Sequence, residues 1–140
     1  MRQLGGKGTV TVLSSGVTRP LMEKALKGWK LDVDLDLKLS ADLIDLRSLY
    51  PIDWAMIKFY LARNGNLLII EPDVRYGGIG AEIAATIAEE MPHVRIKRVG
   101  ARRETIPANP ALHDAMLPTQ QEIVGAINCF NQLSAVSCQL

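Results

Sequence analysis

The chain has 140 residues, of which 48% are hydrophobic and 22% charged, and its 16 basic side chains nearly balance 15 acidic ones. This length and composition suit one globular domain, and we expect a single domain over residues 1–140. The near-neutral charge excludes a global field of the kind that attracts nucleic acid. Neither a signal peptide nor the ~20 apolar residues of a membrane span is present, so we expect a cytoplasmic protein that binds neither nucleic acid nor membrane.

The first predicted elements are a buried strand and a short helix. Residues 9–13 are rich in β-branched side chains and run into a Ser-Ser-Gly segment, which predicts a strand that ends in a turn. Thr18 is suited to cap the following helix, with Pro20 in its first turn and Gly28 as its stop.

Residues 28–40 alternate apolar with polar side chains, and this period of two predicts a half-buried or edge strand. Asp32, Asp34 and Asp36 lie within the pattern and raise the alternative of a calcium loop. Such a loop needs glycine at its sixth position, where this chain has Leu37. The pattern therefore favours solvated carboxylates on one face of a strand over a metal site.

Beyond residue 40, strand and helix patterns alternate, which indicates an α/β fold with a mostly parallel sheet. The unbroken apolar run at 67–70 is typical of a strand buried on both faces. Asp53 is suited to cap the helix that follows Pro51, and Asn64-Gly65 to end it. We expect a three-layer α/β/α sandwich, with strands at 43–46, 67–70 and 94–99 and helices at 53–62 and 79–91.

The C-terminal part is predicted to be a connection and one helix. Three prolines interrupt residues 100–118, so we expect an extended segment with one helical turn at 111–116. The last helix should begin at Gln120, with Thr119 as its cap. We expect the tail at 133–140 to fray.

The segment Gly77-Gly78-Ile79-Gly80 stands between a strand and a helix, where backbone N–H groups can hold an anion. The third small residue of a dinucleotide-binding fingerprint would fall at Ile83, so that motif does not match. We interpret the segment as a tight turn, with Gly78 needed for positive φ and for close packing of helix on sheet. A small-anion site at this turn is the alternative.

Few side chains of this sequence suit catalysis. His93 follows a proline and His113 lies in the Pro-rich connection, so both are interpreted as surface histidines. Cys129 and Cys138 form neither a disulfide framework nor a zinc site, and we expect reduced thiols. We predict no catalytic, cofactor-binding or metal-binding residue in this chain.

The sequence has one local excess of positive charge and one predicted ion pair. The positively charged residues have no aromatic residues interleaved with them in the sequence, which argues against nucleic-acid binding. We interpret this basic cluster as a solvated strand edge or as a surface for an acidic partner. Arg47 is expected to pair with Asp45 or Asp53 and to orient a loop. The basic cluster comprises Arg95, Lys97, Arg98, Arg102 and Arg103.

The segment Ile44-Asp45-Leu46-Arg47-Ser48-Leu49, with Pro51 and Asp53, resembles the Ile-Asp-Leu-Arg-Thr-Leu-x-Pro-x-Asp signature of one family. That family is the beta subunit of the thiamine-diphosphate-dependent decarboxylase component of 2-oxo acid dehydrogenases of the pyruvate, branched-chain and acetoin types. The resemblance is to its C-terminal domain, of the type shared with transketolase. Further matches follow in the family's order at Glu71, the glycine-rich turn, Arg98-Val99, Ile106-Pro107, Leu112, Pro118 and Ile123-Val124.

The resemblance implies a non-catalytic assembly domain that supports oxidative decarboxylation of a 2-oxo acid by a whole enzyme. Thiamine diphosphate and magnesium would be held by other domains of that enzyme. The implied partners are the alpha subunit and a second beta subunit of a heterotetramer and the dihydrolipoyl acyltransferase core, and we expect the isolated chain to self-associate. The alternatives are an independent interaction or small-anion-binding module that uses the turn from Gly77 to Gly80, or the equivalent domain of a transketolase-like transferase.

Overall fold

The computed structural model describes residues 2–4, 9–32 and 41–130. Five strands form one sheet in the order β1-β3-β2-β4-β5, in which β1 is antiparallel to β3 and the other neighbours are parallel. The strands are β1 (Arg2–Leu4), β2 (Val10–Ser15), β3 (Ala41–Leu46), β4 (Asn66–Val74) and β5 (Arg95–Ala101). The helices are α1 (Thr18–Asp32), α2 (Trp54–Asn64), α3 (Ile79–Glu90), α4 (Pro110–Asp114) and α5 (Gln120–Asn128).

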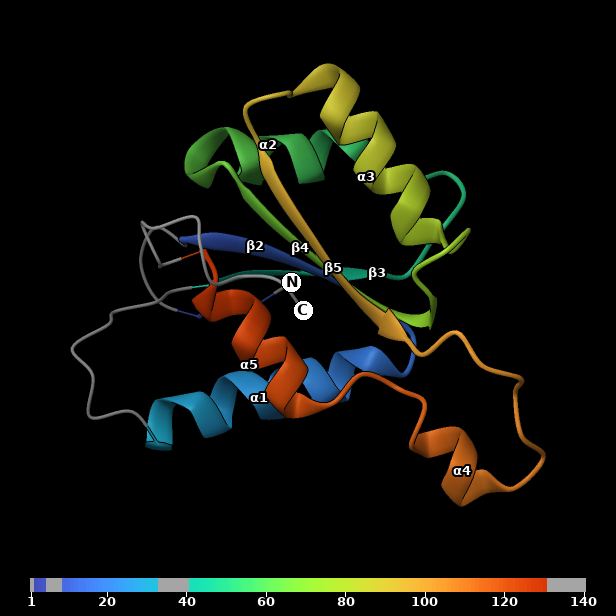
Figure 1. The fold of residues 1–140 in the computed structure, drawn as a ribbon. Helices are drawn as coiled ribbons and strands as arrows, with labels where there is room; N and C mark the ends of the chain where they lie inside the picture. Colours follow the sequence, from blue (N-terminus) through green and yellow to red (C-terminus); the bar gives the residue numbers. More distant parts are fainter. Residues whose placement is uncertain (1, 5–8, 33–40, 131–140) are drawn as a thin grey trace.

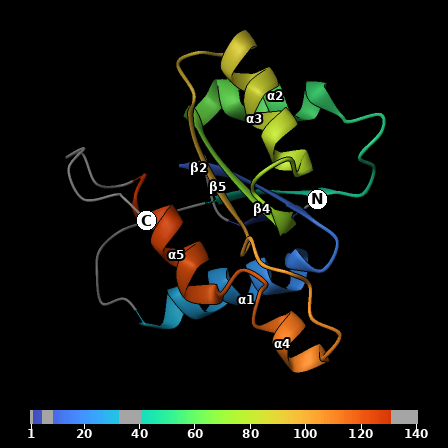
Figure 2. The ribbon, with the colours of Figure 1, turned by 45° about the vertical axis from the view of Figure 1, so that its right-hand side comes forward.

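Helices cover both faces of the sheet, with α1 and α5 on one face and α2 and α3 on the other (Figure 1, and Figure 2 from a second side). The alternation of side chains along β2 divides the core accordingly. Val10 and Val12 pack with Ile123 of α5, whereas Leu13 packs with Ile57 of α2 and Ile83 of α3. The predicted three-layer α/β/α sandwich with a mostly parallel sheet is therefore confirmed.

Most of the predicted helix ends are confirmed by their capping interactions. The Asp53 side chain accepts a hydrogen bond from the N–H of Met56 at 3.0 Å and caps α2. Gly65 ends the same helix in the left-handed conformation, with φ of 67°. Thr119 and Glu122 form a capping box at the start of α5.

The prediction for α1 is confirmed at its start, with Pro20 in the first turn, and was wrong at its C-terminal end. The helix continues through Gly28 to Asp32, so the strand predicted from residue 28 is wrong for 28–32, and the rest of it, 33–40, lies outside the described residues. A glycine inside a helix costs only about 1 kcal/mol relative to alanine, which packing of α1 against α5 can offset. The Thr18 hydroxyl donates hydrogen bonds to the carbonyls of Ser15 and Ile70, and so ties the helix to the sheet in place of the expected cap.

The carboxyl ends of the four parallel strands meet at one edge of the sheet, which we call the carboxyl edge. The connection after β5 leaves from this edge and carries α4, which stands away from the sheet (Figure 1). The predicted helical turn in this connection is confirmed at Pro110–Asp114. In the described part of the chain, no helix is both long and apolar enough to span a membrane.

Candidate functional site

β4 carries a buried carboxylate directly after its apolar run. The Glu71 side chain is 1% exposed. Ile70 pairs with Val99 of β5 and Val74 pairs with Ala101, so β4 bulges between these two pairs. A bulge re-aims the side chains of the bulged strand, and here it accompanies the turn of Glu71 toward the start of α3.

Three glycines lie close to the Glu71 side chain, two of them beside its carboxylate. The N–H of Gly80 donates to its Oε2 at 2.8 Å. A Cβ at Gly78 or Gly80 would lie 2.5 Å from a carboxylate oxygen, and one at Gly100 would lie 3.2 Å from Cγ of Glu71. The expected close packing at Gly78 is confirmed, but its expected positive φ is wrong: φ is −71° at Gly78 and +78° at Gly77.

Burial raises the pKa of the Glu71 carboxyl above its ordinary value. The hydrogen bond from the Gly80 N–H and the nearby positive charge of Arg98 oppose this rise in pKa, and the charge of Asp73 adds to it. Oε1 of Glu71 has no hydrogen-bond partner, so the N–H of Gly80 compensates only part of the lost hydration. The chain thus places its own carboxylate at the N-terminus of α3, where an external anion would have needed the same donor.

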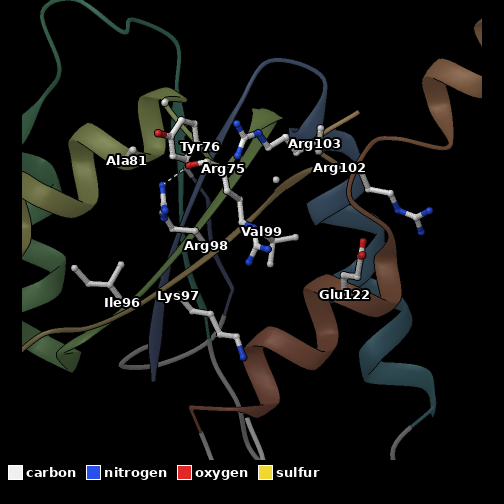
Figure 3. Close-up of a pocket in the computed structure, with 13 residues that line it drawn as sticks. Arg75, Tyr76, Ala81, Ile96, Lys97, Arg98, Val99, Arg102, Arg103 and Glu122 are labelled. Carbon is white, nitrogen blue, oxygen red and sulfur yellow. Dashed lines mark hydrogen bonds between the residues drawn. The ribbon is translucent and has the colours of Figure 1, made fainter. Parts of the chain in front are cut away.

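A cavity of about 940 Å³ runs beside β5, and the predicted basic cluster lines much of it. The described lining residues carry five positive charges, from Arg75, Lys97, Arg98, Arg102 and Arg103, against the single carboxylate of Glu122. Figure 3 shows Arg75, Arg98 and Arg103 grouped near the start of α3, while Arg102 and Lys97 extend toward the α5 side.

Two arginines near this cavity lie against aromatic rings. The sequence predicted the basic cluster but not these ring contacts. The Arg103 guanidinium lies 4.5 Å from the ring centroid of Tyr76, and that of Arg95 lies 5.6 Å from the ring centroid of Phe130. The expectation of a basic cluster without aromatic neighbours is therefore wrong, because the folded chain brings two rings next to it. Arg98 is held by a hydrogen bond from its Nη1 to the carbonyl of Arg75 at 2.8 Å. Both rings are distant in sequence from their arginine partners, so spacing along the strand could not have found them.

The other residues considered from the sequence lie apart from this cavity. Arg47 pairs with Asp45 at 3.3 Å, as one of its two expected partners, and Asp45 is also 3.4 Å from Arg19. His93 is exposed, and His113 lies at the surface beside Asp114. Both histidines are therefore surface residues, as expected.

The expectation of reduced thiols is wrong for Cys129, which takes part in a disulfide. Spacing alone could not identify this bond, because it depends on where the chain places each sulfur atom. Cys138 lies outside the described residues. In the structure, Nζ of Lys97 also donates to Sγ of Cys129 at 2.9 Å.

A site for thiamine diphosphate and its divalent cation would need metal ligands and donors to the phosphates. No group of three or more His, Cys, Asp or Glu side chains within ranges 2–4, 9–32 and 41–130 could hold a metal ion. The donor at the N-terminus of α3 is taken by Glu71. We therefore assign no chemical step of such a cofactor to these residues.

Exposed apolar side chains gather in the connections at the carboxyl edge. Among the described residues, the exposed large apolar side chains lie in the connections that leave β2, β3, β4 and β5 at this edge, except Phe59, which lies within α2. Tyr50 is 95% exposed and Ile106 75% exposed. These exposed side chains, which we call the apolar rim, are Val17, Leu49, Tyr50, Tyr76, Ile106 and Leu112.

Known proteins with related sequences are beta subunits of oxidoreductases. The beta subunit of acetoin:2,6-dichlorophenolindophenol oxidoreductase from Bacillus subtilis is 34% identical over 61% of this chain and 26% of its own length. The mitochondrial pyruvate dehydrogenase E1 beta subunit from Caenorhabditis elegans is 32% identical over 64% of this chain and 26% of its own length. The mitochondrial 2-oxoisovalerate dehydrogenase subunit beta 2 from Arabidopsis thaliana is 38% identical over 57% of this chain and 21% of its own length. The matched segments thus span about a quarter of these relatives.

A solved structure shares the fold. The chain described as "Split gene transketolase, inactive beta4 tetramer" superposes with a TM-score of 0.73 and 23% identity, over 91% of this chain and 41% of that one. The family model described as "Transketolase, C-terminal domain" matches residues 2–123. Because this match spans most of the sequence and the fold agrees, the chain belongs to the family of transketolase C-terminal domains.

Proposed function

We propose that this chain is the C-terminal domain of the beta subunit of a 2-oxo acid dehydrogenase decarboxylase component, and that it serves assembly and not catalysis. The observation that carries the proposal is the common segment of similarity to beta subunits named for acetoin, pyruvate and 2-oxoisovalerate. Enzymes named for different substrates share this segment, which suits a role that does not select the substrate. The activity of the whole enzyme is oxidative decarboxylation of a 2-oxo acid.

The apolar rim is the proposed contact surface with other subunits. Exposed apolar side chains grouped at one edge of a domain are typical of protein interfaces. Ile106 and Leu112 lie on the connection that carries α4, which projects beyond the sheet and can reach a neighbouring subunit. The proposed partners are the alpha subunit, a second beta subunit and the dihydrolipoyl acyltransferase core, in the cytoplasm. Thiamine diphosphate and magnesium belong to other parts of the proposed enzyme.

The alternative of a small-anion module at the Gly77 to Gly80 turn loses its main donor, because the Gly80 N–H already binds Glu71. The equivalent domain of a transketolase-like transferase would have the same fold, and the resemblance to the split-gene transketolase concerns the fold alone. The names of the relatives favour the dehydrogenase beta subunit over this second alternative.

Sedimentation velocity of the 140-residue chain, mixed in turn with the matching alpha subunit and the acyltransferase, tests the assembly role. We expect a complex with at least one partner, and its loss in the double variant Ile106→Asp, Leu112→Asp. Phe59→Asp is the matched control, because Phe59 is 60% exposed on α2 and outside the apolar rim. Failure of the unaltered chain to bind either partner would overturn the proposal, as would equal loss of binding in the control.

A further inference from the structure

β5 is the last strand of the sheet, and no strand of the described ranges pairs with its outer edge. The N–H of Arg95 donates to the carbonyl of Gly65, next to β4. Backbone groups alternate in direction along a strand, so those of Ile96, Arg98 and Gly100 point away from β4. An outer edge of this kind is a template for a further strand.

The cavity follows this edge. Its lining includes every residue from Ile96 to Arg103, so side chains from both faces of β5 contribute to it. A cavity lined by both faces of one strand must lie along the edge of that strand, where Figure 3 shows it between the start of α3 and α5. Its volume of about 940 Å³ falls within the range of ~300–1,000 Å³ found for ligand sites.

The charge of the lining specifies the occupant. A second copy of β5 would bring the same arginines against this edge, and like charges opposed across strands destabilise their pairing. Carboxylates would meet the guanidinium groups of Arg98, Arg102 and Arg103. The carbonyl of Arg75 already orients Arg98, and the ring of Tyr76 already orients Arg103. Less side-chain conformational entropy is therefore lost when these arginines bind a carboxylate.

We propose that the outer edge of β5 binds an acidic segment of a partner polypeptide in extended conformation, as an added strand of the sheet. The backbone of Ile96, Arg98 and Gly100 supplies the ladder of hydrogen bonds, and the arginines select side chains with carboxylates. This inference specifies a partner for the assembly role and so rests on the proposed function. It uses the β5 edge, whereas the subunit contact is tested at Ile106 and Leu112 of the apolar rim, which do not line the cavity; Tyr76 belongs to both surfaces.

The test uses a short fluorescein-labelled peptide that alternates Glu with Val, added to the 140-residue chain. We expect saturable binding that weakens as salt increases, because ion pairs at an exposed edge are screened. Amide exchange should slow on binding at Ile96, Arg98 and Gly100, and change little at Lys97 and Val99. A peptide of the same charge with N-methylated backbone positions should bind at least tenfold more weakly, because it cannot complete the ladder.

Charge reversal provides the second arm. Arg103→Glu and Arg102→Glu should each weaken binding about tenfold, in keeping with loss of a charge-assisted hydrogen bond. Arg47→Glu is the matched control, because Arg47 is exposed at the end of β3 and away from β5. Equal binding of the N-methylated peptide, or protection absent from the β5 amides, would overturn strand addition. The assay contains no alpha subunit, so its failure is distinguishable from failure of the proposed subunit contact.

Discussion

Glu71 joins three elements through one carboxylate. It belongs to β4, accepts a hydrogen bond from the first turn of α3, and lies against Gly100 of β5. The sequence placed Glu71 among the motifs of the family without giving it a role. The signal was present as a carboxylate directly after four apolar residues of a buried strand, followed within ten residues by a glycine-rich turn. A carboxylate buried in this way either finds hydrogen-bond donors or loses its hydration without replacement. Here Oε2 of Glu71 accepts from the N–H of Gly80, and Oε1 has no hydrogen-bond partner.

The raised pKa of Glu71 predicts a pH dependence of stability. A carboxyl with a raised pKa keeps its proton to higher pH in the folded state than in the unfolded state, so the free energy of unfolding falls as pH rises above the ordinary value of 4.5. Glu71→Gln cannot lose a proton and should not show this fall. We therefore expect the stability of the variant relative to the unaltered chain to increase as pH rises from 4.5 toward the folded-state pKa.

Urea unfolding at a series of pH values measures this difference. Glu89→Gln is the control. Glu89 is exposed on the surface of α3, so this substitution removes a carboxylate without altering the buried junction at Glu71. A fall in the stability of Glu71→Gln relative to the unaltered chain as pH rises would contradict the assigned cause. So would the rise expected for Glu71→Gln if the control showed it too.

The junction of β4 and α3 shows how far sequence reasoning reaches for an element. The apolar run at 67–70 and the helix from Ile79 were both predicted, because each has its own periodicity. The glycine turn between them was interpreted from the need for close packing, and that need is confirmed. The sequence of the glycine-rich turn could not show which glycine has positive φ and which has no room for a Cβ. Both properties depend on the path of the chain around Glu71.

A double-mutant cycle tests the packing at this junction. Gly80→Ala places a Cβ 2.5 Å from Oε1 of Glu71, and we expect a loss of about 1–3 kcal/mol in the free energy of unfolding. In the background of Glu71→Ala the carboxylate is gone, so Gly80→Ala should cost much less, with a coupling of roughly 0.5–3 kcal/mol.

Gly125→Ala is the matched control within a helix. A Cβ at Gly125 meets nothing within 4 Å, so alanine should raise stability by about 0.5–1 kcal/mol through its helix propensity. Chemical denaturation of the unaltered chain, the three variants of the cycle and the control gives these values. Additive effects of the Gly80 and Glu71 substitutions would show that the carboxylate is not what glycine accommodates.

For the whole molecule, the alternation of strands and helices and the local capping signals were enough to predict the layers. The errors came from elements whose state is decided by contacts distant in sequence. α1 continues past Gly28, where local propensity predicted a stop. β1 has only three residues and pairs with β3, so its sequence carries no pattern of its own. The aromatic supports of the basic edge come from other elements in the same way.

The last prediction is that the isolated chain self-associates through the apolar rim and not through β5. Side chains such as Tyr50 and Ile106 lack a covering partner in the single chain, and burying them in a two-fold contact is favourable. Sedimentation equilibrium across a concentration series should show a dimer, and Ile106→Asp with Leu112→Asp should make the chain monomeric. Association through the rim should persist at low ionic strength, whereas association through the basic edge would need high salt to screen its arginines. A dimer that forms only at high salt, and that survives the rim substitutions, would place the contact at β5 and contradict the prediction.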